Sequence, residues 1–318
     1  MRKLIALGII LIAMIFLARG FWEGMLAPVS KDTTQKKIII AKGKSVREIA
    51  RQLREEGLIR SELAFILYTR LQGLSYKLTA GTFKLSSSNS TPEIIATLSG
   101  KPTEVWVTLI EGWRVEEVAD ELNSKLQIPM KEFLKVAKEG YMFPDTYLFA
   151  HDVDAVQIAQ RLKETFNIRF SDDLKNKIKD RGLTEEEGVI LASIVEREAR
   201  SEGARQMVAS ILLKRFKIDM GLNADATLQY ALGYQAGEKS WWKRHLTRED
   251  KKVDSPYNTY LYNGLPPTPI SNPGLSSLKT VANADPNTPY LYYYHDSKGN
   301  SHYAKTLEEQ NINVANNP

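Results

Sequence analysis

The first segment with a clear pattern is a continuous apolar run, Leu4–Ala18, which holds 15 residues without a charged or strongly polar side chain. Arg2 and Lys3 precede the run and Arg19 follows it. A helix needs about 20 apolar residues to cross a bilayer, and the aromatic residues after Arg19 extend this one toward that length. The pattern predicts a cytoplasmic stub and transmembrane anchor over residues 1–26, with the remainder outside because basic residues stay on the inner side.

The same segment fits a second interpretation, a cleaved signal peptide. Ala18-Arg19-Gly20 has the small residues that flank a signal-peptidase cleavage point. Arg19 is unfavourable so close to such a point, which favours the uncleaved anchor but leaves both interpretations open. A polar, turn-prone linker follows at residues 27–36.

Residues 37–103 alternate between strand-like and helical patterns. The expected elements are a strand at 37–41, helices at 45–54 and 61–71, a strand at 80–85, and a short helix with Thr91 at its cap. The first helix begins with a capping box, in which Ser45 and Glu48 satisfy free N–H groups of the first turn. This order resembles a LysM-like module, a small fold that binds N-acetylglucosamine polymers, although no specific motif carries the resemblance.

A helix that starts at a second capping box, Thr184–Glu187, contains the residues most suited to acid–base chemistry. Glu196 shares one side of this helix with small residues, and Glu198 is flanked by large apolar ones. Burial raises the pKa of a carboxyl toward the range in which it donates a proton at neutral pH. A helical Glu more often forms a surface pair, here with Arg200, and periodicity does not separate Glu196 from Glu198.

Composition excludes several classes of function. The chain has no Cys, so disulfides, thiolate nucleophiles and Cys-based metal sites are impossible. Its 43 Lys and Arg against 38 Asp and Glu become 40 against 38 once the three basic residues beside the apolar run are set aside. A nearly neutral body argues against nucleic-acid binding, which needs a concentrated basic face.

Four motifs occur in a fixed order along the chain: YMFPDTY from Tyr141, LASIVERE from Leu191, YNTY from Tyr257 and GLPPTPISNPG from Gly264. With the N-terminal apolar run, they resemble the bacterial endolytic murein transglycosylase family, whose members are membrane-anchored and cut peptidoglycan glycan strands. The resemblance implies an α+β protein with a single-pass inner-membrane anchor, a LysM-like module at 37–103 and a mixed α/β catalytic domain at 104–318, outside the cytoplasm. It further implies an enzyme that needs no cofactor and no metal, with glycan strands as substrate and a functional link to peptidoglycan synthases.

The resemblance also implies that Glu196, the first acid of the IVERE run, is the catalytic acid and base. One carboxyl suffices for a lytic transglycosylase, because the C6 hydroxyl of the substrate itself attacks the anomeric carbon and leaves a 1,6-anhydromuramyl end. The chain departs from the family pattern at Ala226, where a Pro is usual. The Trp241-Trp242 pair lies in a segment without a counterpart in the family pattern.

Aromatic faces stack on sugar rings and amides bond N-acetyl groups, which makes several polar and aromatic residues candidates for substrate binding. They are Tyr257, Asn258, Tyr260, Asn272, Asp225 and Gln229. Each fits ordinary turn chemistry or packing equally well.

Two alternative functions remain at this point. A muramidase-type hydrolase needs a second acid near Glu196, for which Asp225, Asp145 and Asp254 are the candidates. A non-enzymatic glycan-binding scaffold of the cell-wall machinery would need neither acid. The chain ends in an expected β-hairpin that could bring His295 and His302 together, without enough ligands for a metal site.

Overall fold

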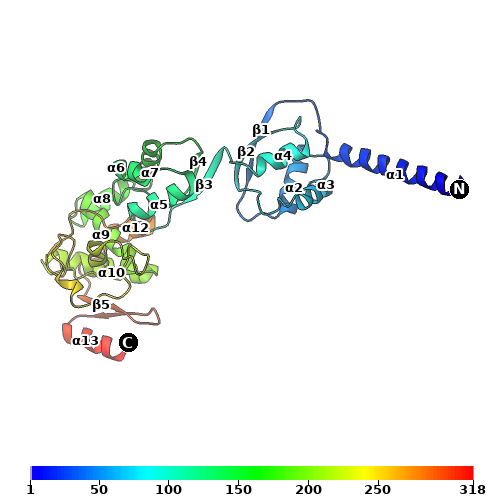
Figure 1. Ribbon diagram of the computed structural model, residues 1–318. Coiled ribbons are helices and arrows are strands. Elements are labelled where there is room, and N and C mark those ends of the chain that lie inside the picture. The colour runs from blue at the N-terminus through cyan, green and yellow to red at the C-terminus, as the bar shows by residue number, and fades with distance from the viewer. Residues whose placement is uncertain (1, 318) are drawn as a thin grey trace. The chain divides into compact units, whose positions relative to one another are not determined.

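A computed structural model describes residues 2–317, with side chains from residue 8 onward, and confirms the mixed α+β fold. The chain forms two compact units (Figure 1). Unit 1 holds Met1–Val107 with Tyr147–Val153, and unit 2 holds Thr108–Thr146 with Asp154–Pro318. Unit 1 therefore also includes Tyr147–Val153, a segment that lies within the expected catalytic domain at 104–318.

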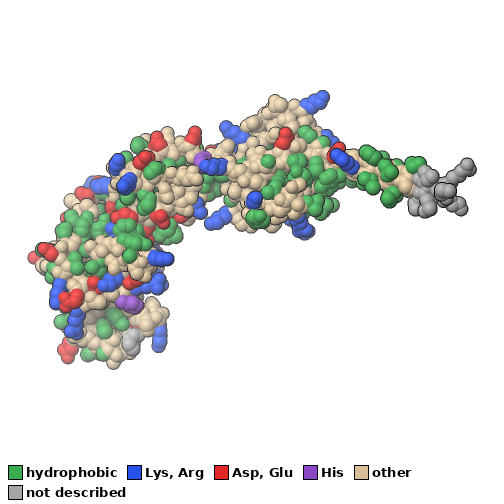
Figure 2. Space-filling view, viewed as in Figure 1, with side chains coloured by type: hydrophobic (Ala, Val, Ile, Leu, Met, Phe, Trp, Pro, Cys, Tyr) green, Lys and Arg blue, Asp and Glu red, His purple; other side chains and the backbone are tan. Residues whose placement is uncertain are grey.

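The N-terminal apolar run forms helix α1, Arg2–Leu26. Its stretch Gly8–Leu26 is long and apolar enough to cross a membrane. The large apolar side chains along it are exposed, and Figure 2 shows them covering the described part of the helix. Exposed apolar side chains on every face are what a lipid-facing helix requires.

Unit 1 is built on one antiparallel pair, in which β1, Gln35–Ile40, lies beside β2, Gly81–Ser86. The four-stranded sheet has the order β1-β2-β3-β4, with β3 at Glu104–Thr108 and β4 at Thr146–Ala150. Its helices are α2 at Val46–Glu55, α3 at Glu62–Leu71 and α4 at Thr91–Leu98. The strand-helix-helix-strand order expected for residues 37–85 is confirmed.

Local capping explains where two of these helices begin. The capping box of Ser45 and Glu48 is present at the start of α2, as the sequence predicts. At α4 the prediction is wrong by one residue, because the side chain of Ser90, not Thr91, accepts the N–H of Glu93. Thr91 already has helical geometry, and Glu93 returns a bond to the Ser90 N–H.

Unit 2 is mainly helical. Its helices are α5 at Val115–Leu126, α6 at Met130–Val136, α7 at Ala155–Arg169, α8 at Asp172–Asp180, α9 at Glu185–Glu198, α10 at Glu202–Lys217, α11 at Asp225–Leu232, the 3-10 turn η1 at Asp250–Lys252, α12 at Leu275–Ala282 and α13 at Leu307–Asn316. A hairpin of β5, Tyr292–His295, and β6, Ser301–Ala304, lies against α13 near the C-terminus (Figure 1).

Helix α9 lies at the centre of unit 2, packed against α8, α10, α11 and α12. Every residue from Gly188 to Val195 is buried, which explains why apolar residues surround this helix in the sequence. Gly188 is required by the packing, since a Cβ there would lie 2.7 Å from two carbons of Ile178. After the acidic first turn, Glu185–Glu187, the next charged side chains of α9 are in its C-terminal turn, at Glu196, Arg197 and Glu198.

The YMFPDTY segment begins with residues packed into unit 2, and the C-terminal residues form the expected hairpin. Met142 and Phe143 are buried, and the ring of Tyr141 meets that of Phe166 with centroids 4.9 Å apart. In the hairpin, His295 pairs with Ser301 and Tyr294 with His302, so the two histidines are not opposite each other.

Candidate active site

The two acids at the end of α9 lie in different surroundings. Residues two apart on a helix are separated by about 200°, so their side chains leave opposite faces. Glu196 points toward the loops that contain Gly112 and Gly274, whereas Glu198 points toward α11 and the C-terminal hairpin.

Glu196 is held as an ion pair. Its Oε1 accepts a bond from Arg205 Nη2 at 3.1 Å, and its Oε2 accepts the backbone N–H of Gly274 at 2.9 Å. Its side chain is only 4% exposed, and that of Arg205 is 15% exposed. Both carboxylate oxygens therefore have donors, one of them the guanidinium of Arg205.

A third acid, Glu111, lies beside this pair. A Cβ at Gly274 would overlap the Glu111 carboxylate, so the glycine allows the close approach of that side chain. Partial burial raises the pKa of Glu111, and the negative charge of Glu196 raises it further while Arg205 lowers it. No sequence pattern points to Glu111, because it comes from a turn about 85 residues before Glu196.

Glu198 is held by uncharged donors. Its Oε1 accepts the backbone N–H of Ala226 and its Oε2 accepts the hydroxyl of Tyr293, both at 3.0 Å. Burial raises the pKa of Glu198 to about 7, and the neighbouring charge of Asp225 adds to the rise. The Ala226 and Tyr293 bonds and the charge of Arg197 oppose the rise without cancelling it. Glu198 is thus poised to change protonation state near neutral pH.

Glu198 opens onto a cleft of about 500 Å³. The cleft lies between the start of α11, the β5 strand and α13. Its lining is rich in tyrosine and polar side chains: Glu198, Arg215, Asn223, Asp225, Lys251, Tyr260, Tyr292, Tyr293, Tyr294, His295, Leu307 and Gln310. Aromatic rings beside polar groups are what a saccharide site requires.

Two of the predicted substrate-binding residues meet in this cleft. The Tyr260 hydroxyl donates to Asp225 Oδ1 at 2.5 Å, and Lys251 Nζ lies 4.1 Å from the centre of the Tyr260 ring. Burial and the charge of Asp225 raise the pKa of Tyr260, which therefore keeps its proton. Asp225 and Tyr260 are 35 residues apart in the sequence, and the structure places both in the same cleft as Glu198.

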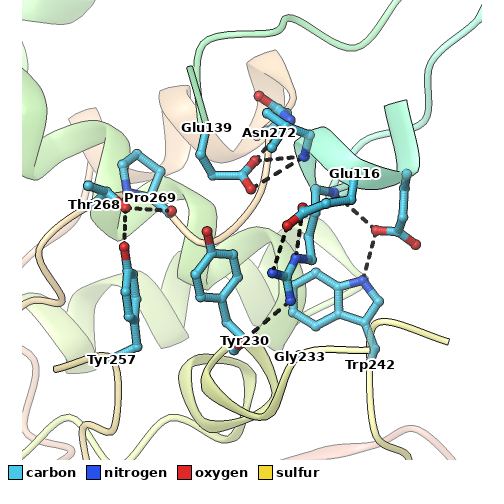
Figure 3. Close-up of polar contacts among 12 residues, drawn as sticks. Glu116, Glu139, Tyr230, Gly233, Trp242, Tyr257, Thr268, Pro269 and Asn272 are labelled. Carbon is cyan, nitrogen blue, oxygen red and sulfur yellow. Dashed lines mark hydrogen bonds and ion pairs between the residues drawn. The ribbon is translucent and has the colours of Figure 1, made fainter. Parts of the chain in front are cut away.

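The other four candidates are engaged in bonds within unit 2. Asn258 is fully buried and donates to the backbone oxygens of Lys251 and Val253, while Gln229 donates to that of Lys243. The Tyr257 hydroxyl lies 2.6 Å from that of Thr268 (Figure 3). These side chains shape the loops around the clefts and do not line the cleft of Glu198.

Asn272 joins three loops. Its amide donates to the backbone oxygen of Trp113 and to Glu139 Oε1, and its side-chain oxygen accepts the N–H of Met142. Glu139 also accepts the N–H of Val115 (Figure 3). Burial raises the pKa of Glu139 to about 8, with a contribution from the charge of Glu116, so this carboxyl is largely protonated at neutral pH.

The second acids named for the hydrolase alternative are not placed beside Glu196. Asp145 pairs with Arg169, and Asp254 accepts the hydroxyl of Tyr262 on the surface. Asp225 lies in the cleft of Glu198. Among the described residues, Glu111 is an acid whose pKa the charge of Glu196 raises, and Asp225 is an acid whose charge raises the pKa of Glu198.

Comparison with known proteins gives one consistent result. Residues 38–316 match the model of the YceG-like family. A protein of Bacillus subtilis named endolytic murein transglycosylase is 31% identical over 92% of this chain and 87% of its own length. One of the same name from Streptococcus pneumoniae is 26% identical over 89% of this chain and 59% of its own length. A crystal structure of a YceG-like protein from Listeria monocytogenes superposes with a TM-score of 0.64 at 28% identity, covering 88% of this chain and 99% of that one.

Proposed function

We propose that Glu198 is the acid and base of the reaction of this chain, which belongs to the YceG-like family and acts as an endolytic murein transglycosylase. One observation carries the proposal: Glu198 has a pKa of about 7 and faces a cleft that also holds Asp225 and Tyr260. Glu196, which the family resemblance implied, has both carboxylate oxygens engaged, by Arg205 and by the Gly274 N–H. We assign Glu196 a structural role, in which it fastens the 272–274 loop and α10 to α9.

The reaction has two proton transfers. Protonated Glu198 gives its proton to the glycosidic oxygen as the bond to the anomeric carbon breaks. The C6 hydroxyl of the same muramyl residue then attacks that carbon, and the Glu198 carboxylate takes the hydroxyl proton. The product is a 1,6-anhydromuramyl end, and no water is consumed. Because the nucleophile is intramolecular, the step needs no second reactant to be positioned.

The cleft supplies the other groups that the reaction needs. The Asp225 carboxylate raises the pKa of Glu198 and lies where it can stabilise positive charge at the anomeric centre. The Tyr260 hydroxyl fixes Asp225, and the Tyr293 hydroxyl orients Glu198. Removing one such preorganised group from an active site commonly costs about 100-fold or more in rate.

The remaining parts of the chain fit an enzyme of the growing wall. Helix α1 serves as a single-pass anchor in the inner membrane and keeps both units on the outer side, beside newly made strands. Residues 37–103 act as a LysM-like module that holds N-acetylglucosamine units of the strand. Cleavage of nascent strands ends their elongation, which places the enzyme in association with peptidoglycan synthases.

Mass spectrometry of cleavage products tests the proposal. The full-length protein in detergent is incubated with uncrosslinked peptidoglycan strands, as wild type and as Glu198→Gln, Glu196→Gln and the double variant Glu196→Gln, Arg205→Gln. We expect internal fragments with anhydro ends from the wild type, and a loss of about 100-fold to 10,000-fold in rate for Glu198→Gln. The double variant removes both charges of the ion pair and should retain most of the wild-type rate.

Three other outcomes would change the catalytic residue or the function that we propose. A folded double variant as inactive as Glu198→Gln would return the catalytic role to Glu196. Fragments with reducing ends would support the hydrolase and make Asp225 the second acid. Intact strands that still bind the wild-type protein would support the glycan-binding scaffold.

A further inference from the structure

A second cleft, of about 610 Å³, lies in unit 2 and is lined in part by residues that follow α11, whereas Asp225 at the start of α11 lines the Glu198 cleft. Three aromatic side chains line it, Trp113, Tyr234 and Trp241, and so do the acids Glu117, Asp120 and Glu121. None of these belongs to the Glu198 cleft. Trp241 belongs to the Trp241-Trp242 pair, whose sequence fits core packing, a surface contact or a sugar platform.

The tryptophan pair has two separate functions in the structure. Trp242 is 7% exposed, its Nε1–H donates to Glu117 Oε2 at 2.9 Å, and the guanidinium carbon of Arg197 lies 3.8 Å from its ring centre. Figure 3 shows the Trp242 indole beside the Tyr230 segment. Trp242 is therefore a packing residue, whereas Trp241 lines the cleft.

The aromatic rings of the lining are held in place by contacts with Arg114 and with one another. Buried Arg114 lies between Tyr230 and Trp241, with its guanidinium carbon 4.0 and 4.6 Å from the two ring centres. Two nitrogens of that guanidinium donate to Glu116, which sets its orientation. The rings of Tyr234 and Trp241 meet edge to face, with centroids 5.2 Å apart. Such stacking holds Trp241 in one orientation before any ligand arrives.

The polar lining of the cleft consists of three acids together with Lys239 and Ser240, so acidic groups outnumber the single cation. Glu117 accepts the Arg114 backbone N–H and the Trp242 indole through Oε2, so its Oε1 can accept a bond from a ligand. Asp120 is exposed at the rim. Carboxylates accept hydroxyl and amide protons and repel phosphates and other anions. Rings for stacking and acceptors for hydroxyl groups together suit an uncharged N-acetylhexosamine.

We propose that the Trp113–Tyr234–Trp241 cleft binds an N-acetylhexosamine unit of the glycan strand, at a distance from the bond that is cut. Helix α11 connects the two clefts: Asp225 at its start lines the Glu198 cleft, and Tyr234 follows its last residue, Leu232. Eight helical residues span about 12 Å, so a strand that lies along α11 reaches both clefts. The inference rests on the proposed function, because it takes glycan strands as the substrate.

The test uses full-length protein in detergent, labelled with 5-fluorotryptophan, and a linear tetramer of N-acetylglucosamine as the probe. The chain has five tryptophans, and their fluorine signals distinguish this cleft from unit 1, where Trp22 and Trp106 lie. We expect the tetramer to shift the signals of Trp113 and Trp241. Tyr234→Ala should weaken the affinity that both signals report about tenfold, and Trp241→Ala should weaken the affinity that the Trp113 signal reports by a similar factor, the usual cost of removing a central aromatic contact.

The matched control is Trp106→Phe, since Trp106 is 39% exposed and lies outside the cleft. It should leave the Trp241 response and the cleavage rate unchanged. Tyr234 is 51% exposed, so its truncation tests the cleft even if Trp241→Ala fails to fold. For strand cleavage, Tyr234→Ala should raise KM with little change in kcat, as expected for binding remote from the reacting bond.

Two results separate failure of this inference from failure of the proposed function. If the wild type cleaves strands but the tetramer shifts neither Trp113 nor Trp241, and Tyr234→Ala leaves KM unchanged, the cleft is not a sugar site. If the wild type yields no cleavage products and the tetramer still shifts Trp241 in a Tyr234-dependent way, the sugar site stands and the catalytic proposal falls.

Discussion

Glu196 and Glu198 stand two residues apart on one helix and differ in the kind of donor that each carboxylate meets. Glu196 meets a cation, Arg205, and a backbone N–H. Glu198 meets a backbone N–H and a neutral hydroxyl, Tyr293. A buried carboxylate beside a cation stays charged, while one held by neutral groups retains the pKa rise that burial causes. The comparison shows that burial alone does not make a proton donor; the charge of the partners decides.

The largest expected effect comes from breaking the Glu196 pair. Arg205→Met leaves the Glu196 carboxylate buried with only the Gly274 N–H as donor, which should cost about 3–5 kcal/mol in the free energy of unfolding. Glu198→Gln should cost about 1 kcal/mol, since it removes no charged partner. Denaturant unfolding of the full-length protein in detergent measures both, and equal losses would contradict the distinction between the two acids.

The pH dependence of cleavage tests whether Glu198 is the proton donor. If Glu198 must be protonated to act, kcat/KM falls as pH rises through about 7, by about tenfold per unit beyond it. Initial rates on uncrosslinked strands between pH 5 and 9 give this profile. A rate that stays constant up to pH 9 would mean that the donor is a group other than Glu198.

Much of the site's framework could be predicted from the sequence. The capping box of Thr184 and Glu187, the apolar helix after it and the charged last turn are local features, and the structure confirms the first two in the predicted places. The choice between Glu196 and Glu198 could not be predicted, because it depends on Arg205, Gly274 and Tyr293. These come from separate elements, and their approach follows from packing around α9 rather than from periodicity.

The candidate substrate-binding residues show the same limit of prediction from sequence. Asp225 and Tyr260 were identified by residue type, and the structure places them together because the Asn258 side chain shapes the loop that carries Tyr260. Asn258 and Asn272 have equally suitable chemistry, yet both are buried and bonded to backbone. Residue type indicates what a side chain can bind, and only burial shows whether a ligand can reach it.

Glu139 is another buried carboxyl whose pKa is raised, and it does not line the Glu198 cleft. Its pKa is about 8 in the folded protein against about 4.3 unfolded, so the folded state binds the proton more tightly. The stability that it contributes is complete below about pH 4 and is lost as pH rises through about 8. Glu139→Gln should therefore lose less stability than the wild type between pH 5 and 9. Thermal unfolding at both pH values measures this, and identical pH dependence in the two proteins would show that Glu139 is charged when folded.

The smallest effect concerns the hydroxyl that distinguishes Glu198 from Glu196. The Tyr293 bond to Glu198 Oε2 stabilises the carboxylate and lowers its pKa, so Tyr293→Phe should raise that pKa. A neutral hydrogen bond contributes about 1 kcal/mol, so the descending limb of the pH–rate profile should move upward by somewhat less than about one unit. A merely structural Tyr293 would change the rate equally at every pH. Tyr262→Phe removes a matching hydroxyl bond, to Asp254 on the surface, and should leave the profile in place. A downward shift in Tyr293→Phe, or the same shift in both variants, would mean that the neutral donor does not set the pKa of Glu198.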